Sequence, residues 1–140
     1  MNTPDRLPLS LLLLRLSVFL VMLMWTIDKI LNPDHAAAVY EKFYFIGGVS
    51  PTLLLGIALA ELALLLAFVA GIAKTYTYGA VLLLHAVSTL SSYQQYLNPF
   101  EGPNLLFFAA WPMLAACLAL FWLRAEDRLC LLYTSDAADD

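Results

Sequence analysis

The sequence is short of charged side chains. Only 13% of its 140 residues are Asp, Glu, Lys or Arg, whereas 62% are hydrophobic and the mean hydropathy is +0.79. A soluble domain carries about 25% charged residues, which cover its surface. This chain has about half of that share, so its composition argues against a soluble domain and indicates one integral membrane domain.

Cysteine and histidine are scarce as well, with two of each. Cys130 belongs to an unusual C-terminal stretch, so Cys117 stands alone in an apolar run and is expected to be a small buried hydrophobe. One cysteine excludes a Cys-x-x-Cys redox motif. Haem ligation between spans needs two histidines at matched depth, but only His85 lies in an apolar segment, and His35 does not. A zinc ligand set, a phosphate loop, a nucleophile motif and a nucleic-acid patch are also missing, so we expect no metal site and no nucleic-acid partner.

The final eleven residues, CLLYTSDAADD (130–140), are acidic and have no helical period. They match one reading frame of a transposon-end adapter used in preparing sequencing libraries, so we interpret them as translated sequencing adapter. The alternative is a natural acidic tail. On the first interpretation residues 1–129 are the natural domain, and the natural chain continues beyond Leu129. Residues 1–129 then contain seven basic and eight acidic residues, so their net charge is −1 in place of −4. A net charge this small indicates nothing about partners.

Four apolar segments are long enough to span a bilayer, which takes about 20 helical residues. The predicted spans are residues 8–31, 51–73, 75–96 and 104–123. Pro8 is expected to open the first span, and Asn32-Pro33 to end it. Residues 32–48 predict a short helix on the outer membrane interface, with Asn32 as its cap and several aromatic side chains. The predicted fold is therefore all-α, a four-helix transmembrane bundle with an interfacial helix between the first and second spans.

Basic residues are distributed unevenly between the two ends of these spans. The residues on the side of the two chain termini are Arg6, Lys74, Arg124 and Arg128. Cytoplasmic loops carry the excess of lysine and arginine. We therefore expect both termini in the cytoplasm, with residues 32–50 and 97–103 facing outward.

Ionisable residues occur within the spans, where each charge costs roughly 2.5–3.5 kcal/mol on insertion scales. Glu61 and His85 lie near the middle of the second and third spans, so we expect them at similar depth on neighbouring helices. The two side chains could form a structural hydrogen bond, handle a proton or a ligand, or lie apart. Arg15 is expected to extend its side chain to the cytoplasmic surface.

Polar residues form a stripe along the third span. Ser88, Thr89 and Ser92 follow His85 on one helical face, toward the outer end. Trp25 and Lys29 of the first span lie at the same outer level. The predicted polar pocket, open to the outside, comprises Trp25, Lys29, Glu61, His85, Ser88, Thr89 and Ser92. Alternatively the hydroxyl groups serve helix packing, because they can bond to their own helix.

Three features carry a family resemblance. The stretch RLSVFLVMLMWTIDKILNP has an early arginine and a late lysine, Glu61 is followed by Gly71, and four spans are regularly placed over residues 9–123. In these features the chain resembles the DoxX-like family of small four-helix bacterial membrane proteins. Thr26 departs from the pattern, since the family often has glycine three residues before the lysine. The resemblance implies a bacterial inner-membrane location and a link to quinone-dependent or sulfur-related redox complexes, with a redox partner protein.

Three functions fit these observations. The first is a membrane subunit of a redox system, in which Glu61 and His85 hydrogen-bond a quinone headgroup and a tryptophan packs on its ring. The second is a small-solute transporter or permeability factor with Glu61 as its proton-coupled site. The third is a non-catalytic assembly or scaffold protein that uses the polar stripe for contacts between helices.

Overall fold

The computed structural model describes residues 3–48 and 50–129, except for the side chains of residues 3–5. The predicted adapter tail, residues 130–140, lies outside the described residues. The helices are α1 (Thr3–Leu31), α2 (Pro33–Tyr44), α3 (Pro51–Ala70), α4 (Lys74–Ser91), α5 (Tyr93–Leu97), the 3₁₀ helix η1 (Asn104–Ala109) and α6 (Ala110–Trp122). Within the described ranges there is no strand, so the all-α prediction is confirmed.

Three helical segments are long and apolar enough to cross a membrane: Arg6–Leu31, Pro51–Ala70 and Asn104–Trp122. The third predicted span, residues 75–96, is helical too, but it is interrupted. α4 ends at Ser91, and Ser92 (φ −90°, ψ 22°) separates it from α5. Because α4 also carries lysine, histidine and several hydroxyl groups, its hydropathy is lower than that of the other three.

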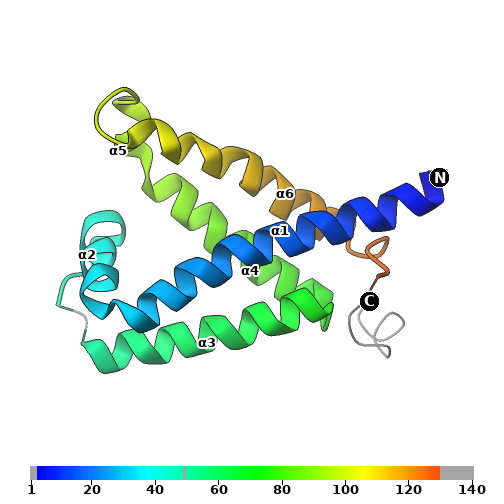
Figure 1. The fold of residues 1–140 in the computed structure, drawn as a ribbon, viewed down its shortest axis with the longest axis horizontal. Coiled ribbons are helices and arrows are strands. Elements are labelled where there is room, and N and C mark those ends of the chain that lie inside the picture. The colour runs from blue at the N-terminus through cyan, green and yellow to red at the C-terminus, as the bar shows by residue number, and fades with distance from the viewer. Residues whose placement is uncertain (1–2, 49, 130–140) are drawn as a thin grey trace.

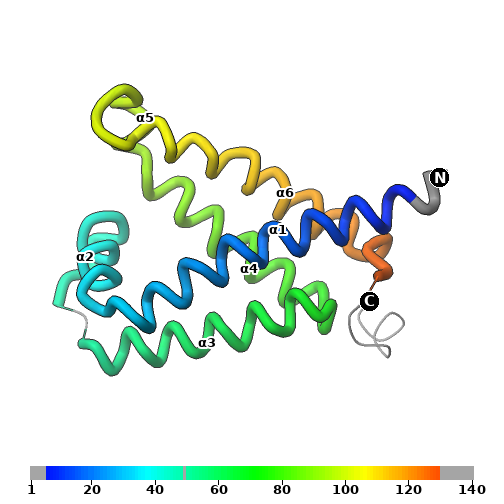
Figure 2. The backbone as a smooth tube through the Cα atoms, in the orientation of Figure 1, coloured from blue at the N-terminus to red at the C-terminus, as the bar shows by residue number. Residues whose placement is uncertain are grey.

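The long helices form two side-by-side pairs, α1 with α3 and α4 with α6, which cross each other and define two ends of the molecule (Figure 1). α1 packs against α3 and α6, and α4 packs against α6 and α3. α2 contacts α1, α3 and α4 at the end opposite the chain termini, where α5 also lies (Figure 2). The predicted outer loops therefore gather at one end and the termini at the other.

The end of α1 at Leu31, just before Asn32-Pro33, agrees with the prediction, whereas its start does not. The helix begins at Thr3, so Pro8 does not open it but lies in its second turn. A proline there removes only one backbone hydrogen bond close to the helix start, and the helix continues through it. Asn32 stands at the N-cap position of α2, but its side-chain oxygen makes no cap hydrogen bond, and its amide N–H donates to Asp28 Oδ1 at 2.8 Å.

Helix ends explain the connections on either side of α3. The Ser50 hydroxyl accepts a hydrogen bond from the backbone N–H of Leu53, a regular N-cap. Gly71 ends the helix with φ +81°, a left-handed conformation that glycine adopts without strain. This turn leaves only residues 71–73 between α3 and α4, which are therefore antiparallel neighbours.

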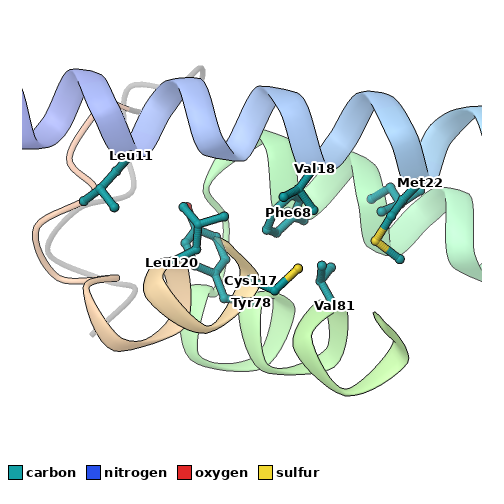
Figure 3. Packing of buried hydrophobic residues seen from close by; sticks show 9 residues of the cluster. Leu11, Val18, Met22, Phe68, Tyr78, Val81, Cys117 and Leu120 are labelled. Carbon is teal, nitrogen blue, oxygen red and sulfur yellow. The ribbon is translucent and has the colours of Figure 1, made fainter. Parts of the chain in front are cut away.

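The last span starts as a 3₁₀ helix and becomes α-helical at Ala110. This places Pro112 in the first turn of α6, where a missing N–H does little harm. The core between the helices draws on all four long helices (Figure 3), through Leu11, Val18, Met22, Leu65, Phe68, Tyr78, Val81, Cys117 and Leu120. Cys117 is buried there, as its apolar surroundings predict.

Large apolar side chains also cover the outside of the helices. Leu20 of α1, Leu59 of α3 and Leu83 of α4 are all more than half exposed. Such an apolar exterior would be unfavourable in water and is normal for helices that face lipid.

Candidate functional site

An ion pair joins α1 to α3 near the end of the molecule that holds α2. Lys29 Nζ lies 2.8 Å from both carboxylate oxygens of Glu61, with the side chains 22% and 17% exposed. Thr26, one turn before Lys29, is buried, and its hydroxyl oxygen lies 3.3 Å from Glu61 Oε2 and 2.8 Å from the Met22 carbonyl oxygen. Thr26 thus contributes to the site.

Two tyrosines of α2 cover this region. The Lys29 ammonium group lies 5.8 Å from the centre of the Tyr40 ring, a cation–π arrangement. Burial raises the pKa of the Tyr40 phenol above its ordinary value. One turn later, the Tyr44 hydroxyl lies 2.7 Å from Ser88 Oγ and connects α2 to α4. As aromatic side chains of the predicted interfacial helix, both tyrosines were expected to face the membrane interface, and their contacts with Lys29 and Ser88 were not predicted, although their spacing places them on one face of α2.

His85 is buried among polar and aromatic groups, with only 1% of its surface exposed. Its Nε2 lies 3.0 Å from the carbonyl oxygen of Ala110 in α6 and 3.3 Å from the Thr89 hydroxyl. The Trp25 ring stacks on the imidazole at 6.1 Å between ring centres, with 22° between their planes. In the part of the chain that the structure describes, Nδ1 of His85 is buried without a hydrogen-bond partner.

Glu61 and His85 take different partners. Among the described residues, Glu61 bonds to Lys29 and Thr26, whereas His85 bonds to Ala110 and Thr89. α1 connects the two groups, because Trp25 stacks on His85 and Lys29, one turn further on, pairs with Glu61.

The polar stripe of α4 is used largely within its own helix. Thr89 donates its hydroxyl proton to the His85 carbonyl at 2.7 Å, and Ser92 donates to the Ser88 carbonyl at 3.4 Å. Tyr96 of α5 donates to the Thr89 carbonyl at 2.8 Å. Ser88 also bonds to Tyr44 of α2, and the Ser92 side chain bonds to Tyr96 of α5. The bonds of Thr89 and Ser92 to carbonyl groups of their own helical segment are of the kind that the packing alternative expects.

A second polar cluster lies at the opposite end and corrects the prediction for Arg15. Its side chain does not reach the surface but is 0% exposed, with Nη1 2.9 Å from Asp127 Oδ2 and 3.1 Å from the Tyr78 hydroxyl. A counter-charge from beyond α6 holds the guanidinium inside, which removes the need to extend it to water. The role of Asp127 was not predicted, because nothing in its local sequence pattern indicates that residues 123–129 fold back.

On the outer surface, Asp28 pairs with His35 of α2, with 2.5 Å between Oδ2 and Nδ1. The two side chains are 36% and 63% exposed, so this contact lies outside the buried clusters. The described residues contain no group of three or more His, Cys, Asp and Glu side chains that could hold a metal ion.

Comparison of the chain with protein-family models, curated proteins and solved structures finds no match, so the DoxX-like resemblance stays a prediction.

Proposed function

We propose that this protein is a DoxX-like four-helix bundle of the bacterial inner membrane that binds the headgroup of a quinol at the site around Trp25, Lys29, Glu61 and His85. In this proposal it is the membrane subunit of a redox system. A partner protein accepts the electrons of the bound quinol.

The pattern of exposure along α4 supports its role as a membrane span, in addition to the three segments that are long and apolar enough to cross a membrane. Its polar residues Lys74, Tyr78 and His85 are buried against neighbouring helices, whereas Leu83 and Leu90 are exposed. A helix that turns its polar face inward and its leucines outward suits a lipid environment despite its modest hydropathy. α2, with its aromatic side chains, would then lie on the outer interface.

The distribution of basic residues supports the orientation with both termini in the cytoplasm. Arg6 near the start of α1, Lys74 at the start of α4 and Arg124 just after α6 lie at the end where the termini lie (Figure 1). Lysine and arginine near the ends of the spans favour the cytoplasmic side. The site around Glu61 and His85 would consequently lie in the half of the bundle toward the outer side.

The buried Nδ1 of His85 is the observation that carries the ligand proposal. An imidazole that donates its Nε2–H to the Ala110 carbonyl has, in its neutral form, an Nδ1 that can only accept. Buried acceptors are normally paired, so a donor is expected beside this nitrogen. A quinol hydroxyl is such a donor; because Nδ1 is closed to solvent, quinol binding requires the neighbouring side chains to move, and upon oxidation the hydroxyl proton could pass to Nδ1.

The other parts of the site suit the same ligand. Trp25 is 46% exposed although it stacks on His85, so an aromatic headgroup could pack on its open surface. The partly exposed Lys29–Glu61 pair offers both a donor and an acceptor to a second ring oxygen. An apolar site with a few convergent polar groups is the usual form of a small-molecule site.

The test measures quinol binding to the purified full-length protein and its variants. His85→Leu should lower the affinity roughly tenfold or more, because the Nδ1 acceptor is lost. His35→Leu is the matched control, since His35 is exposed and lies outside the site, and its affinity should equal that of the wild type. Equal quinol affinity of His85→Leu and His35→Leu would refute the proposal.

The remaining functions would give different results in the same preparation. Proton release upon addition of a solute, abolished in Glu61→Gln and accompanied by no quinol binding, would favour a transporter. A triple Ser88→Ala, Thr89→Ala, Ser92→Ala variant that loses a partner protein, again without quinol binding, would favour a scaffold. Either result would contradict the quinol site.

A further inference from the structure

The segment that follows α6 is bound tightly to the rest of the protein. Residues 123–129 form turns and no regular helix, and they lie beside α1 at the end of the molecule that holds the termini (Figure 2). Asp127 within this segment is 0% exposed, as is Arg15 of α1. A surface tail would leave an aspartate in water, so its complete burial requires a specific reason.

Hydrogen bonds from two helices hold the segment in place. The Arg15 guanidinium bonds to the Asp127 carboxylate at 2.9 Å and donates to the carbonyl oxygen of Leu129. From α4, Tyr78 donates its hydroxyl proton to the same carboxylate, and Lys74 Nζ lies 2.6 Å from the Asp127 carbonyl oxygen. Side chain and backbone of Asp127 are therefore both engaged.

The charge of Arg15 depends on this arrangement. The side chain leaves α1 in the middle of an apolar span and has no access to the surface. Within the described residues, Asp127 is the carboxylate that pairs with it. Removal of one member of a buried pair leaves an uncompensated charge, which is much more harmful than replacement of both members by apolar groups.

We propose that residues 123–129 are a latch, directly after α6, that completes the fold, with Asp127 supplying the counter-charge that lets Arg15 stay buried. Arg15 is synthesised first, and Asp127 follows 112 residues later. The half of α1 near the chain termini can therefore reach its final packing only after the latch has been made. The latch thus stabilises the assembled helices, a role independent of the proposed quinol site.

The test compares thermal unfolding of full-length variants in detergent. Asp127→Asn should raise the unfolding equilibrium constant roughly 100-fold or more, because Arg15 is left buried without a counter-charge. Glu126→Gln is the matched control, since it removes the neighbouring acid, which is exposed, and should change the constant by about twofold at most.

A double variant keeps the test decisive if Asp127→Asn fails to fold. Arg15→Met with Asp127→Leu replaces both charges by apolar side chains and should recover most of the lost stability. The proposal is overturned if Asp127→Asn is as stable as Glu126→Gln. It is equally overturned if the double variant is no more stable than Asp127→Asn.

Discussion

The ion pair between Lys29 and Glu61 should be one of the stronger bonds between α1 and α3. Two unit charges about 3 Å apart attract each other by roughly 6 kcal/mol at an effective dielectric constant of about 20. Desolvation of the two groups opposes this attraction, but both side chains keep some exposure, 22% and 17%. Fully exposed pairs contribute about 0–1 kcal/mol, and breaking a fully buried pair costs about 3–5 kcal/mol. We expect a coupling energy of about 2 kcal/mol, between these limits.

A double-mutant cycle with Lys29→Met and Glu61→Gln measures this energy. The free energy of unfolding would be obtained for the wild type, both single variants and the double variant, by titration of the protein with a denaturing detergent. Glu41→Gln and Lys42→Met form the control cycle, because both residues are exposed and lie on α2 at the same end of the molecule. Their coupling should be close to zero.

The result that would refute this reasoning is a Lys29–Glu61 coupling no larger than that of the control cycle. The pair would then be compensated fully by its loss of hydration, as many crystallographic ion pairs are. A coupling above about 4 kcal/mol would also contradict the expectation, because it would require the pair to be sealed from solvent.

Two further predictions concern local geometry. Gly71→Ala should destabilise the protein by about 1 kcal/mol, because Gly71 has φ +81°, whereas Gly56→Ala, in open space within α3, should be neutral or stabilising; thermal unfolding of the two variants checks this. Tyr44→Phe should lower the free energy of unfolding by about 0.5–1.5 kcal/mol, because the hydrogen bond to Ser88 is lost. Once that bond is absent, adding Ser88→Ala should lower it little further. If the double variant instead loses the sum of the two single effects, the two hydroxyl groups act separately.

The sequence was sufficient for most of the helical architecture, since helix formation in an apolar chain depends on local signals. Pro51 predicts the start of α3, which begins there, whereas the predicted end at residue 73 lies three residues beyond the observed end at Ala70, because Gly71 stops the helix. The break at Ser92 could not be predicted, because no proline or glycine marks it. The start of α1 at Thr3 was not predicted, because Pro8 is a typical helix start, whereas here the helix continues through it.

The site could be predicted only in part, because the neighbours of each side chain depend on how its helix is rotated about its axis and not only on its depth in the membrane. Glu61 and His85 were placed at similar depth, but depth does not determine which neighbour each side chain meets. Lys29 lies one turn after Trp25, so a single face of α1 serves both groups. The pairing of Arg15 with Asp127 joins residues 112 positions apart through an irregular segment, and no periodic pattern describes such a contact.

The 3₁₀ segment at the start of the last span changes how far that span reaches. A 3₁₀ helix rises about 2.0 Å per residue, compared with about 1.5 Å in an α-helix. Asn104–Ala109 therefore gains about 3 Å over the same residues in α-helical form, and the span Asn104–Trp122 extends to about 31–32 Å in place of about 28–29 Å. The hydrocarbon core of a bilayer is about 30 Å thick. The stretched turn thus allows a 19-residue segment to match the bilayer without local thinning of the lipid.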